Sequence, residues 1–344
     1  MEHRDGDGRV AVVIVTKDRC AGLLETLARL QELPERPLVT VVDNASTDET
    51  PEAVAALAER DASVRLVRLP RNLGAAGRNC GVAVTPCPYV AFSDDDSWWA
   101  PRALETAADL LDAHPQVGLL AGRVLVGDAG KLDPTCAAME VSPVRPAPGP
   151  GRSVLGFVAC GAVVRRQAFL EVGGFRLGYG VGGEEEVFAI DMAAAGWSLS
   201  YSPSVTAHHH PSAARDPAEG RRRLQARNAL RTAWLRRRPV GALRRTIQVA
   251  REAVGDRAAL LGMADAAGDL VWIWHERAPV AASLDADLTR LWRAPNVLPG
   301  GAGGCRNPRP IGSRAGPPGR QVSPACGQSP SPAHASTSTS GRRC

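Results

Sequence analysis

Three apolar runs in the first hundred residues end in aspartate, and this pattern restricts the folds open to the chain. The runs are VAVVIVTKD (10–18), LVTVVD (38–43) and YVAFSDDD (89–96). They are rich in valine and lack the alternation of polar and apolar residues that marks a half-exposed strand. Strands buried on both faces occur in parallel sheets that are covered by helices on each side. The runs therefore predict an α/β protein with a central parallel sheet.

Helical segments are expected between and after these strands. Residues 21–33 carry leucines at helical spacing, residues 51–60 follow residues that can cap a helix, and residues 72–85 are a glycine-bearing turn that enters a helix. With a further strand at 64–70, strand and helix alternate as in a doubly wound sheet. The remaining expected elements are a helix at 101–114, a strand at 117–126, a loop at 142–152, a strand and short helix within 157–175, a helix and strand within 182–203, and helices within 219–275.

Acidic residues gather at the predicted strand ends. In a parallel sheet, ligands bind beyond the carboxyl ends of the strands, where Asp18, Asp43 and the triplet Asp94–Asp96 fall. A single aspartate there is commonly a turn or helix cap. Three adjacent carboxylates, however, repel one another unless a cation lies among them. A hard cation such as Mg²⁺ or Mn²⁺, held together with a diphosphate, would relieve this repulsion.

The bulk composition is that of a globular protein with its charge concentrated in segments. The chain is 44% hydrophobic and 22% charged, and its net charge of +5 owes much to residues 293–344, which hold seven arginines and no acid. That tail, rich in Gly, Pro, Ser and Arg, is expected to be disordered. The eight cysteines include no CxxC pair, which predicts free thiols in a reducing cytosol. A cytoplasmic protein is expected, because the N-terminus is too polar for a secretory signal and the longest apolar run (154–164) is too short to span a bilayer.

Six motifs along the chain resemble those of the family-2 glycosyltransferases. They are VVIVTKDR, VTVVDNASTDET, LPRNLGAAGRNCGV, VAFSDDDSWW, CGAVVRRQAFLEVGGF and GGEEEVFAIDMAAAGW, in the family's order. The resemblance implies the nucleotide-sugar-binding fold called GT-A, a doubly wound, mostly parallel sheet flanked by helices. It also divides the chain into a catalytic domain at 9–212, an arginine-rich helical extension at 213–292 and the tail at 293–344.

The resemblance implies a set of donor-site residues at the strand ends and on the glycine turn. The residues expected to bind the nucleotide sugar are Thr16, Asp18, Arg19, Asp43, Arg78, Asp94 and Asp95. Asp43 is expected to bond the base, and Asp94 to lie near the ribose. Asp96, in the place of the family's DxD motif, and His208, in VTAHHHP, are the expected ligands of Mn²⁺ or Mg²⁺. The two histidines that follow are interpreted as exposed.

The catalytic base is expected in GGEEEV, where the family commonly carries Glu-Asp. The resemblance places Glu184 at the Glu and Glu185 at the Asp, which serves as general base. The chain departs from the family by having glutamate there and a third acid, Glu186. Which of the three is the base is left open, with Glu185 favoured. A second departure is Asp191, where many relatives carry arginine.

These groups suit the transfer of a sugar from a nucleoside diphosphate with inversion. A positioned carboxylate takes the proton of the acceptor hydroxyl, while a metal and an arginine stabilise the departing diphosphate. On the acceptor side, Trp98 and Trp99 are expected to form an apolar platform near Glu186, with two core aromatics as the alternative. Arg227, in ARNALRTAW, is expected to reach the diphosphate.

Two other functions stay open at this point. A sugar nucleotidyltransferase would share the fold, but the turn at 72–81 lacks the basic loop that grips a triphosphate. An inactive module that binds a nucleotide sugar would explain the departures at Glu185 and Asp191. The sequence names neither the sugar nor the acceptor, which is expected to be a glycan, a lipid-linked sugar or a small molecule in cell-envelope glycan synthesis.

The segment between Glu219 and Glu252 has many arginines and no acid. One interpretation is an amphipathic surface on an anionic membrane, at its inner face, with a lipid-linked acceptor nearby. A solvated arginine-rich face is the equal alternative, and nucleic acid is the less favoured partner.

Overall fold

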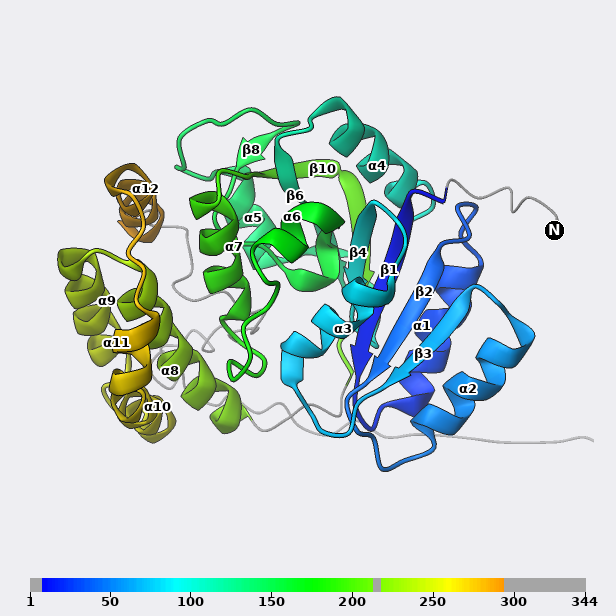
Figure 1. The fold of residues 1–344 in the computed structure, drawn as a ribbon, viewed down its shortest axis with the longest axis horizontal. Helices are drawn as coiled ribbons and strands as arrows, with labels where there is room; N and C mark the ends of the chain where they lie inside the picture. Colours follow the sequence, from blue (N-terminus) through cyan, green and yellow to red (C-terminus); the bar gives the residue numbers. More distant parts are fainter. Residues whose placement is uncertain (1–7, 213–217, 294–344) are drawn as a thin grey trace, which may run out of the picture. The chain divides into compact units, whose positions relative to one another are not determined.

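The computed structural model describes residues 8–212 and 218–293 (Figure 1). Its sheet begins with β1 (Val10–Thr16), β2 (Leu38–Asp43), β3 (Val64–Arg68) and β4 (Tyr89–Ser93), which pair in parallel in the order β3-β2-β1-β4. The side chains from Ala11 to Ile14 are fully buried, as predicted for a central strand. The predicted tail lies, apart from Arg293, outside the described residues.

The second half of the sheet is mixed in direction. It continues from β4 through β9 (Ala162–Arg165), β6 (Val117–Val126) and β10 (Ser198–His209) to β5 (Ser97–Trp99), and short β7 (Lys131–Leu132) and β8 (Arg152–Ser153) pair with β6 and β10. β9 runs antiparallel to both β4 and β6, whereas β10 runs parallel to β6. Buried strands of either direction are apolar, so the sequence pattern did not distinguish these antiparallel pairings.

Helices cover both faces of the sheet, as the doubly wound prediction requires. One face packs against α1 (Cys20–Gln31), α2 (Thr50–Arg60) and α4 (Ala103–Ala113). The other packs against α3 (Gly77–Val84), α5 (Pro134–Glu140), α6 (Arg166–Glu171) and α7 (Glu184–Ala194), with the 3₁₀ turns η1 (Gly74–Ala76) and η2 (Ala159–Gly161). Alternate residues of each strand enter the two cores. Because β1 pairs in parallel with both β2 and β4, the carboxyl ends of these strands lie at one edge of the sheet.

A helical extension follows, comprising α8 (Ala218–Arg236), α9 (Pro239–Glu252), α10 (Arg257–Gly268), α11 (Leu270–Glu276) and α12 (Ala282–Arg293). Part of its arginine run is buried and paired with acids. Arg236 binds Asp191 of α7, and Arg237 binds Asp285 at 2.5 Å. The departure at Asp191 is thus explained by a partner in the extension. The boundary between the two predicted domains stays an interpretation.

Close packing between α8 and α10 predicts an effect on stability. A Cβ on Gly262 would lie 2.1 Å from the carbonyl oxygen of Arg223 and 3.1 Å from the Cβ of Ala226. Although alanine favours helix over glycine, Gly262→Ala is expected to lower the free energy of unfolding by about 2 kcal/mol because the helices must separate. Urea unfolding measures this change.

Gly268, at the end of the same helix, is the matched control. A Cβ there would meet nothing within 4 Å, so Gly268→Ala should leave the free energy of unfolding unchanged or slightly higher. Equal stability of the Gly262→Ala protein and the unchanged protein would contradict the described packing of α10 on α8.

Candidate active site

The triplet Asp94–Asp96 forms the turn between β4 and β5, and its three side chains have different partners. Asp94 accepts a hydrogen bond from Arg78 on α3 at 2.5 Å. Asp95 accepts one from the hydroxyl of Thr16, the last residue of β1, at 2.9 Å. Asp96 lies 3.2 Å from Nε2 of His209 on β10. The three adjacent carboxylates are therefore held by three separate elements, which offsets their mutual repulsion.

The contacts of Asp95 are with other parts of the protein. Burial, followed by the neighbouring charges of Asp94 and Asp96, raises its pKa to about 6. Its backbone carbonyl accepts a hydrogen bond from the Thr26 hydroxyl at 3.0 Å. These contacts fix the turn and leave Asp94 and Asp96 to face outward.

Asp94, Asp96 and His209 form a group of possible metal ligands. One donor atom from each lies within 4.8 Å of the others, and the backbone N–H of Ser212 donates to Asp96 at 2.9 Å. Two carboxylate oxygens and one imidazole nitrogen suit Mn²⁺, and carboxylates with water suit Mg²⁺. Among the described residues, this is the group whose chemistry fits a divalent cation.

The histidine in this group differs from the one expected from the sequence. Side chains alternate across a strand, so His208 lies on the opposite face of β10 from His209 and stacks on Trp98, with ring centroids 6.0 Å apart. Trp98 also lies under the guanidinium of Arg29, 4.3 Å from its ring centroid. Trp99 is fully buried in the core, which corrects the expectation that it forms part of an acceptor platform.

Arg78 links the triplet to the glutamates of α7. Its side chain is buried beneath the rings of Phe92 and Phe175. Burial works against its charge, but the carboxylates of Asp94, Glu184 and Glu185 together raise its pKa. Arg78 is therefore a fixed cation between two acidic groups that come from distant parts of the sequence.

The three glutamates at the start of α7 have different surroundings. Glu184 accepts a hydrogen bond from the N–H of Gly182, in the loop just before the helix. Burial, and next the charge of Glu184, raises the pKa of Glu185 well above its usual range, and its Oε2 has no hydrogen-bond partner among the described residues. Glu186 is influenced instead by Arg245 and Arg237 of the extension. Glu186 is thus buried near the arginines of the extension, and its expected place on the acceptor side stays a prediction.

The expected nucleoside-binding residues lie together at the ends of β1 and β2. The N–H of Thr47 donates to Asp18 at 2.6 Å, and hydrogen bonds from Lys17 first and then Thr47 lower the pKa of Asp18 to about 2. Asp43 is fully buried; its Oδ1 accepts from the N–H of Ser46, whereas Oδ2 has no hydrogen-bond partner among the described residues. Arg19 precedes α1 at the same edge, and its charge offsets only a small part of the rise in the pKa of Asp95. Oδ2 of Asp43 lies 3.7 Å from Nε of the exposed Arg68, so this edge has a buried carboxylate beside exposed charges.

A glycine-rich loop at 178–183 positions the glutamates, and α8 holds this loop. Asn228 is fully buried and donates to the carbonyls of Tyr179 at 2.8 Å and Gly182 at 2.6 Å. Gly180 approaches Gly74 so closely that a Cβ on Gly74 would lie 2.8 Å from its Cα. The sequence analysis singled out Arg227 in ARNALRTAW but not the next residue, Asn228, which holds the loop.

Replacing Asn228 with alanine should destabilise the protein and displace the loop. Two buried carbonyls would lose their donor, at a cost of about 2–4 kcal/mol. We expect a lower melting temperature and a lower transfer rate, measured by calorimetry and by product release. Thr232→Val is a milder control, since it removes only the hydroxyl contact with Tyr179 at 3.2 Å. An Asn228→Ala protein with unchanged stability would contradict this role.

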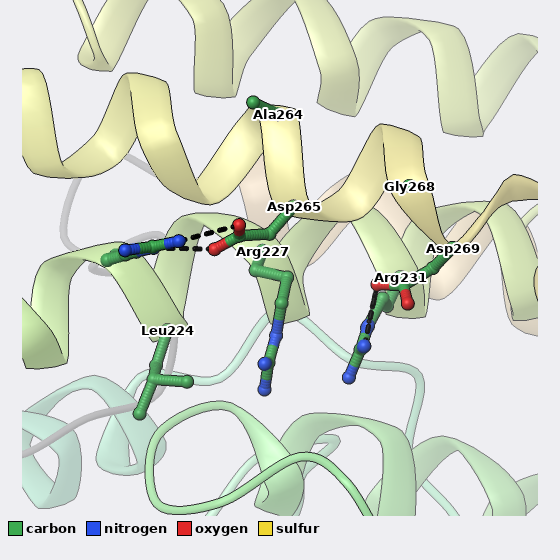
Figure 2. A pocket seen from close by; sticks show the side chains of 8 residues that line it. Leu224, Arg227, Arg231, Ala264, Asp265, Gly268 and Asp269 are labelled. Carbon is green, nitrogen blue, oxygen red and sulfur yellow. Dashed lines mark hydrogen bonds and ion pairs between the residues drawn. The ribbon is translucent and has the colours of Figure 1, made fainter.

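An open cavity of about 680 Å³ lies between α8 and α10, lined by residues of these two helices and by Asp269, which follows α10 (Figure 2). Arg223 binds Asp265 and Arg231 binds Asp269, each at 2.6 Å. Figure 2 shows Arg227 between these two ion pairs, and its guanidinium donates to the carbonyls of Gly178 and Tyr179 at 2.9 Å. Arg227 thus supports the glycine loop, and its expected contact with a diphosphate stays a prediction.

Comparisons with known proteins show which family the chain resembles. The family model described as Glycosyl transferase family 2 matches residues 11–173. A relative from Mycobacterium tuberculosis (strain ATCC 25618 / H37Rv), N-acetylglucosaminyl-diphospho-decaprenol L-rhamnosyltransferase, is 29% identical over 244 residues, which cover 60% of this chain and 78% of that protein. Over residues 11–173 the chain resembles the glycosyltransferases of family 2. The family resemblance inferred from the motifs is thereby confirmed.

Further relatives agree with this family-2 assignment. Pre-mycofactocin glycosyltransferase of the same organism is 28% identical over 228 residues, covering 62% of this chain and 44% of that protein. Among solved structures, a mannosyltransferase from Pyrobaculum calidifontis has a TM-score of 0.50 at 22% identity, covering 83% of this chain and 87% of its own. GalNAc-T7 has a TM-score of 0.52 at 14% identity, covering 76% and 57%. These two likenesses concern the fold, and they confirm the predicted GT-A type.

Proposed function

We propose that this family-2 glycosyltransferase moves a sugar from a nucleoside-diphosphate sugar to a hydroxyl of a lipid-linked glycan, with inversion. The M. tuberculosis relative is named for an acceptor on a diphospho-decaprenol lipid, which supports this acceptor class over a free small molecule. The observation that carries the proposal is the position of Arg78 between Asp94 on one side and Glu184 and Glu185 on the other.

The metal group supports the donor half of the proposal. Asp94, Asp96 and His209 would hold Mn²⁺ or Mg²⁺, which when bound neutralises charge on a diphosphate leaving group. Arg78 adds a second fixed positive charge close to Asp94. At the neighbouring strand ends, the buried Oδ2 of Asp43 has no hydrogen-bond partner among the described residues and pairs with Arg68 at 3.7 Å; it is suited to accept an N–H of the nucleobase.

Glu185 supplies the base of the reaction. As the acceptor oxygen forms its bond to the anomeric carbon, the bond to the diphosphate oxygen breaks, and Glu185 takes the hydroxyl proton. The raised pKa of Glu185 makes its carboxylate a stronger base than an exposed glutamate. One displacement without a covalent intermediate inverts the anomeric centre.

Product analysis with a panel of nucleoside-diphosphate sugars tests this function. The protein would be incubated with each donor and polyprenyl-diphosphate-linked sugars, with Mn²⁺ or with a chelator. The proposal predicts release of nucleoside diphosphate and a heavier lipid-linked product with Mn²⁺ only. Pyrophosphate release would point to a nucleotidyltransferase, and donor binding without release would point to an inactive module.

A further inference from the structure

Helix α9 exposes a stripe in which apolar and cationic side chains alternate. Val240, Leu243 and Ile247 are 62%, 53% and 44% exposed, although aliphatic side chains are normally buried in a soluble helix. Arg244 and Arg251 are exposed at the same helical spacing. These five residues are the α9 stripe.

The opposite face of α9 already has its packing partners. Ala242, Arg245, Val249 and Ala253 are buried, and Val249 packs with residues of α8 and α10. Within the described ranges 8–212 and 218–293, neither arginine of the stripe forms an ion pair with an acid. The α9 stripe therefore exposes both apolar and positively charged side chains, and it contains no carboxylate.

The neighbouring helix α11 is also unusually apolar at its surface. Leu270, Val271 and Trp274 are exposed whereas Ile273 is buried, and Trp274 is 78% exposed. Tryptophan favours the interface between water and lipid. Helix α9 is nevertheless the element that combines both kinds of side chain on one face.

We propose that the α9 stripe docks on an anionic lipid surface. Residues 218–293 contain fifteen arginines and eight acids, so the extension as a whole is attracted to anionic headgroups. Apolar residues interleaved with arginine match a helix that lies in the bilayer interface. No helix among the described residues is long and apolar enough to cross a membrane, so binding would be peripheral.

Charge argues against the other partners for this surface. A second copy of the chain, docked stripe to stripe, would bring arginines against arginines. Nucleic acid would engage the arginines but would leave the aliphatic side chains in water, whereas a bilayer uses both. The inference goes beyond the proposed function, because binding to lipid can be measured without sugar transfer.

Vesicle co-sedimentation tests the proposal. The full chain would be mixed with vesicles of phosphatidylcholine containing about one third phosphatidylglycerol, and with vesicles of phosphatidylcholine alone. We expect binding to the anionic vesicles that weakens as salt is raised. Arg244→Gln with Arg251→Gln should reduce the partition coefficient roughly tenfold or more. Val240→Ser, Leu243→Ser and Ile247→Ser combined should reduce it by a similar factor.

Matched controls separate the stripe from general surface properties. Arg60→Gln with Arg152→Gln removes the same charge from exposed sites elsewhere, and Val141→Ser with Leu170→Ser removes exposed apolar groups. Both control proteins should bind anionic vesicles as the unchanged protein does. Absence of vesicle binding, equal binding by the stripe variants, or a dimer that the stripe variants abolish in place of vesicle binding would each overturn the proposal.

Discussion

Replacing Glu185 with glutamine is expected to lower the rate of sugar transfer by about a thousandfold. The amide keeps the size of the side chain and removes its ability to accept the hydroxyl proton. Binding of the donor should change little, because Asp94, Asp96 and Arg78 are untouched. Steady-state rates of nucleoside diphosphate release, together with donor titration, measure the two effects separately.

The pH dependence provides a second measure of the same role. Glu185 acts only when unprotonated, so transfer should be lost as pH falls through its pKa. Because burial raises that pKa, the loss should occur well above pH 4.5, the ordinary value for glutamate. In Glu185→Gln this limb of the profile should disappear.

Glu186→Gln is the matched control for Glu185. Glu186 interacts with Arg245 and Arg237 in the extension, so its replacement should affect stability more than the rate per folded molecule. A Glu185→Gln protein that retains the full rate would move the base to Glu184.

Asp96→Asn is expected to reduce Mn²⁺-dependent transfer by at least about a hundredfold. The carboxylate supplies one of two negative charges in the metal group, and its loss weakens the hold on the cation. His209→Gln should weaken Mn²⁺ binding about tenfold or more. Both effects are measured by the Mn²⁺ concentration needed for half-maximal activity.

His208→Gln tests which histidine is the ligand. His208 stacks on Trp98 on the other face of β10, so its replacement should leave the Mn²⁺ requirement unchanged. The reverse outcome, with His208→Gln impaired and His209→Gln normal, would restore the assignment made from the sequence.

The first four strands were predictable because their burial leaves a direct trace in the sequence. The run VAVVIV (10–15) has no polar residue to place in water, so its position at the centre of the sheet follows. That the acids at the strand ends lie close together was also predictable, because the carboxyl ends of parallel strands lie at the same edge of a sheet.

The phase of β10 was not predictable in the same way. A register shift between Ser202 and Thr206 sets which of three consecutive histidines faces Asp96, and alternation alone cannot reveal that irregularity. The same limit applies to Trp98 and Trp99, one of which enters the core. The surroundings of Glu186 were not predictable either, because Arg237 and Arg245, whose charges act on it, lie in the extension, far from it in the sequence.

The central claim is that Asp94, Asp96 and His209 hold a divalent cation that binds the diphosphate of the donor. Calorimetric titration of a nucleoside diphosphate, with Mn²⁺ and with a chelator, tests it most directly. The account predicts at least about tenfold tighter binding with Mn²⁺, and loss of that gain in Asp96→Asn. Equal affinity with and without the metal would contradict it.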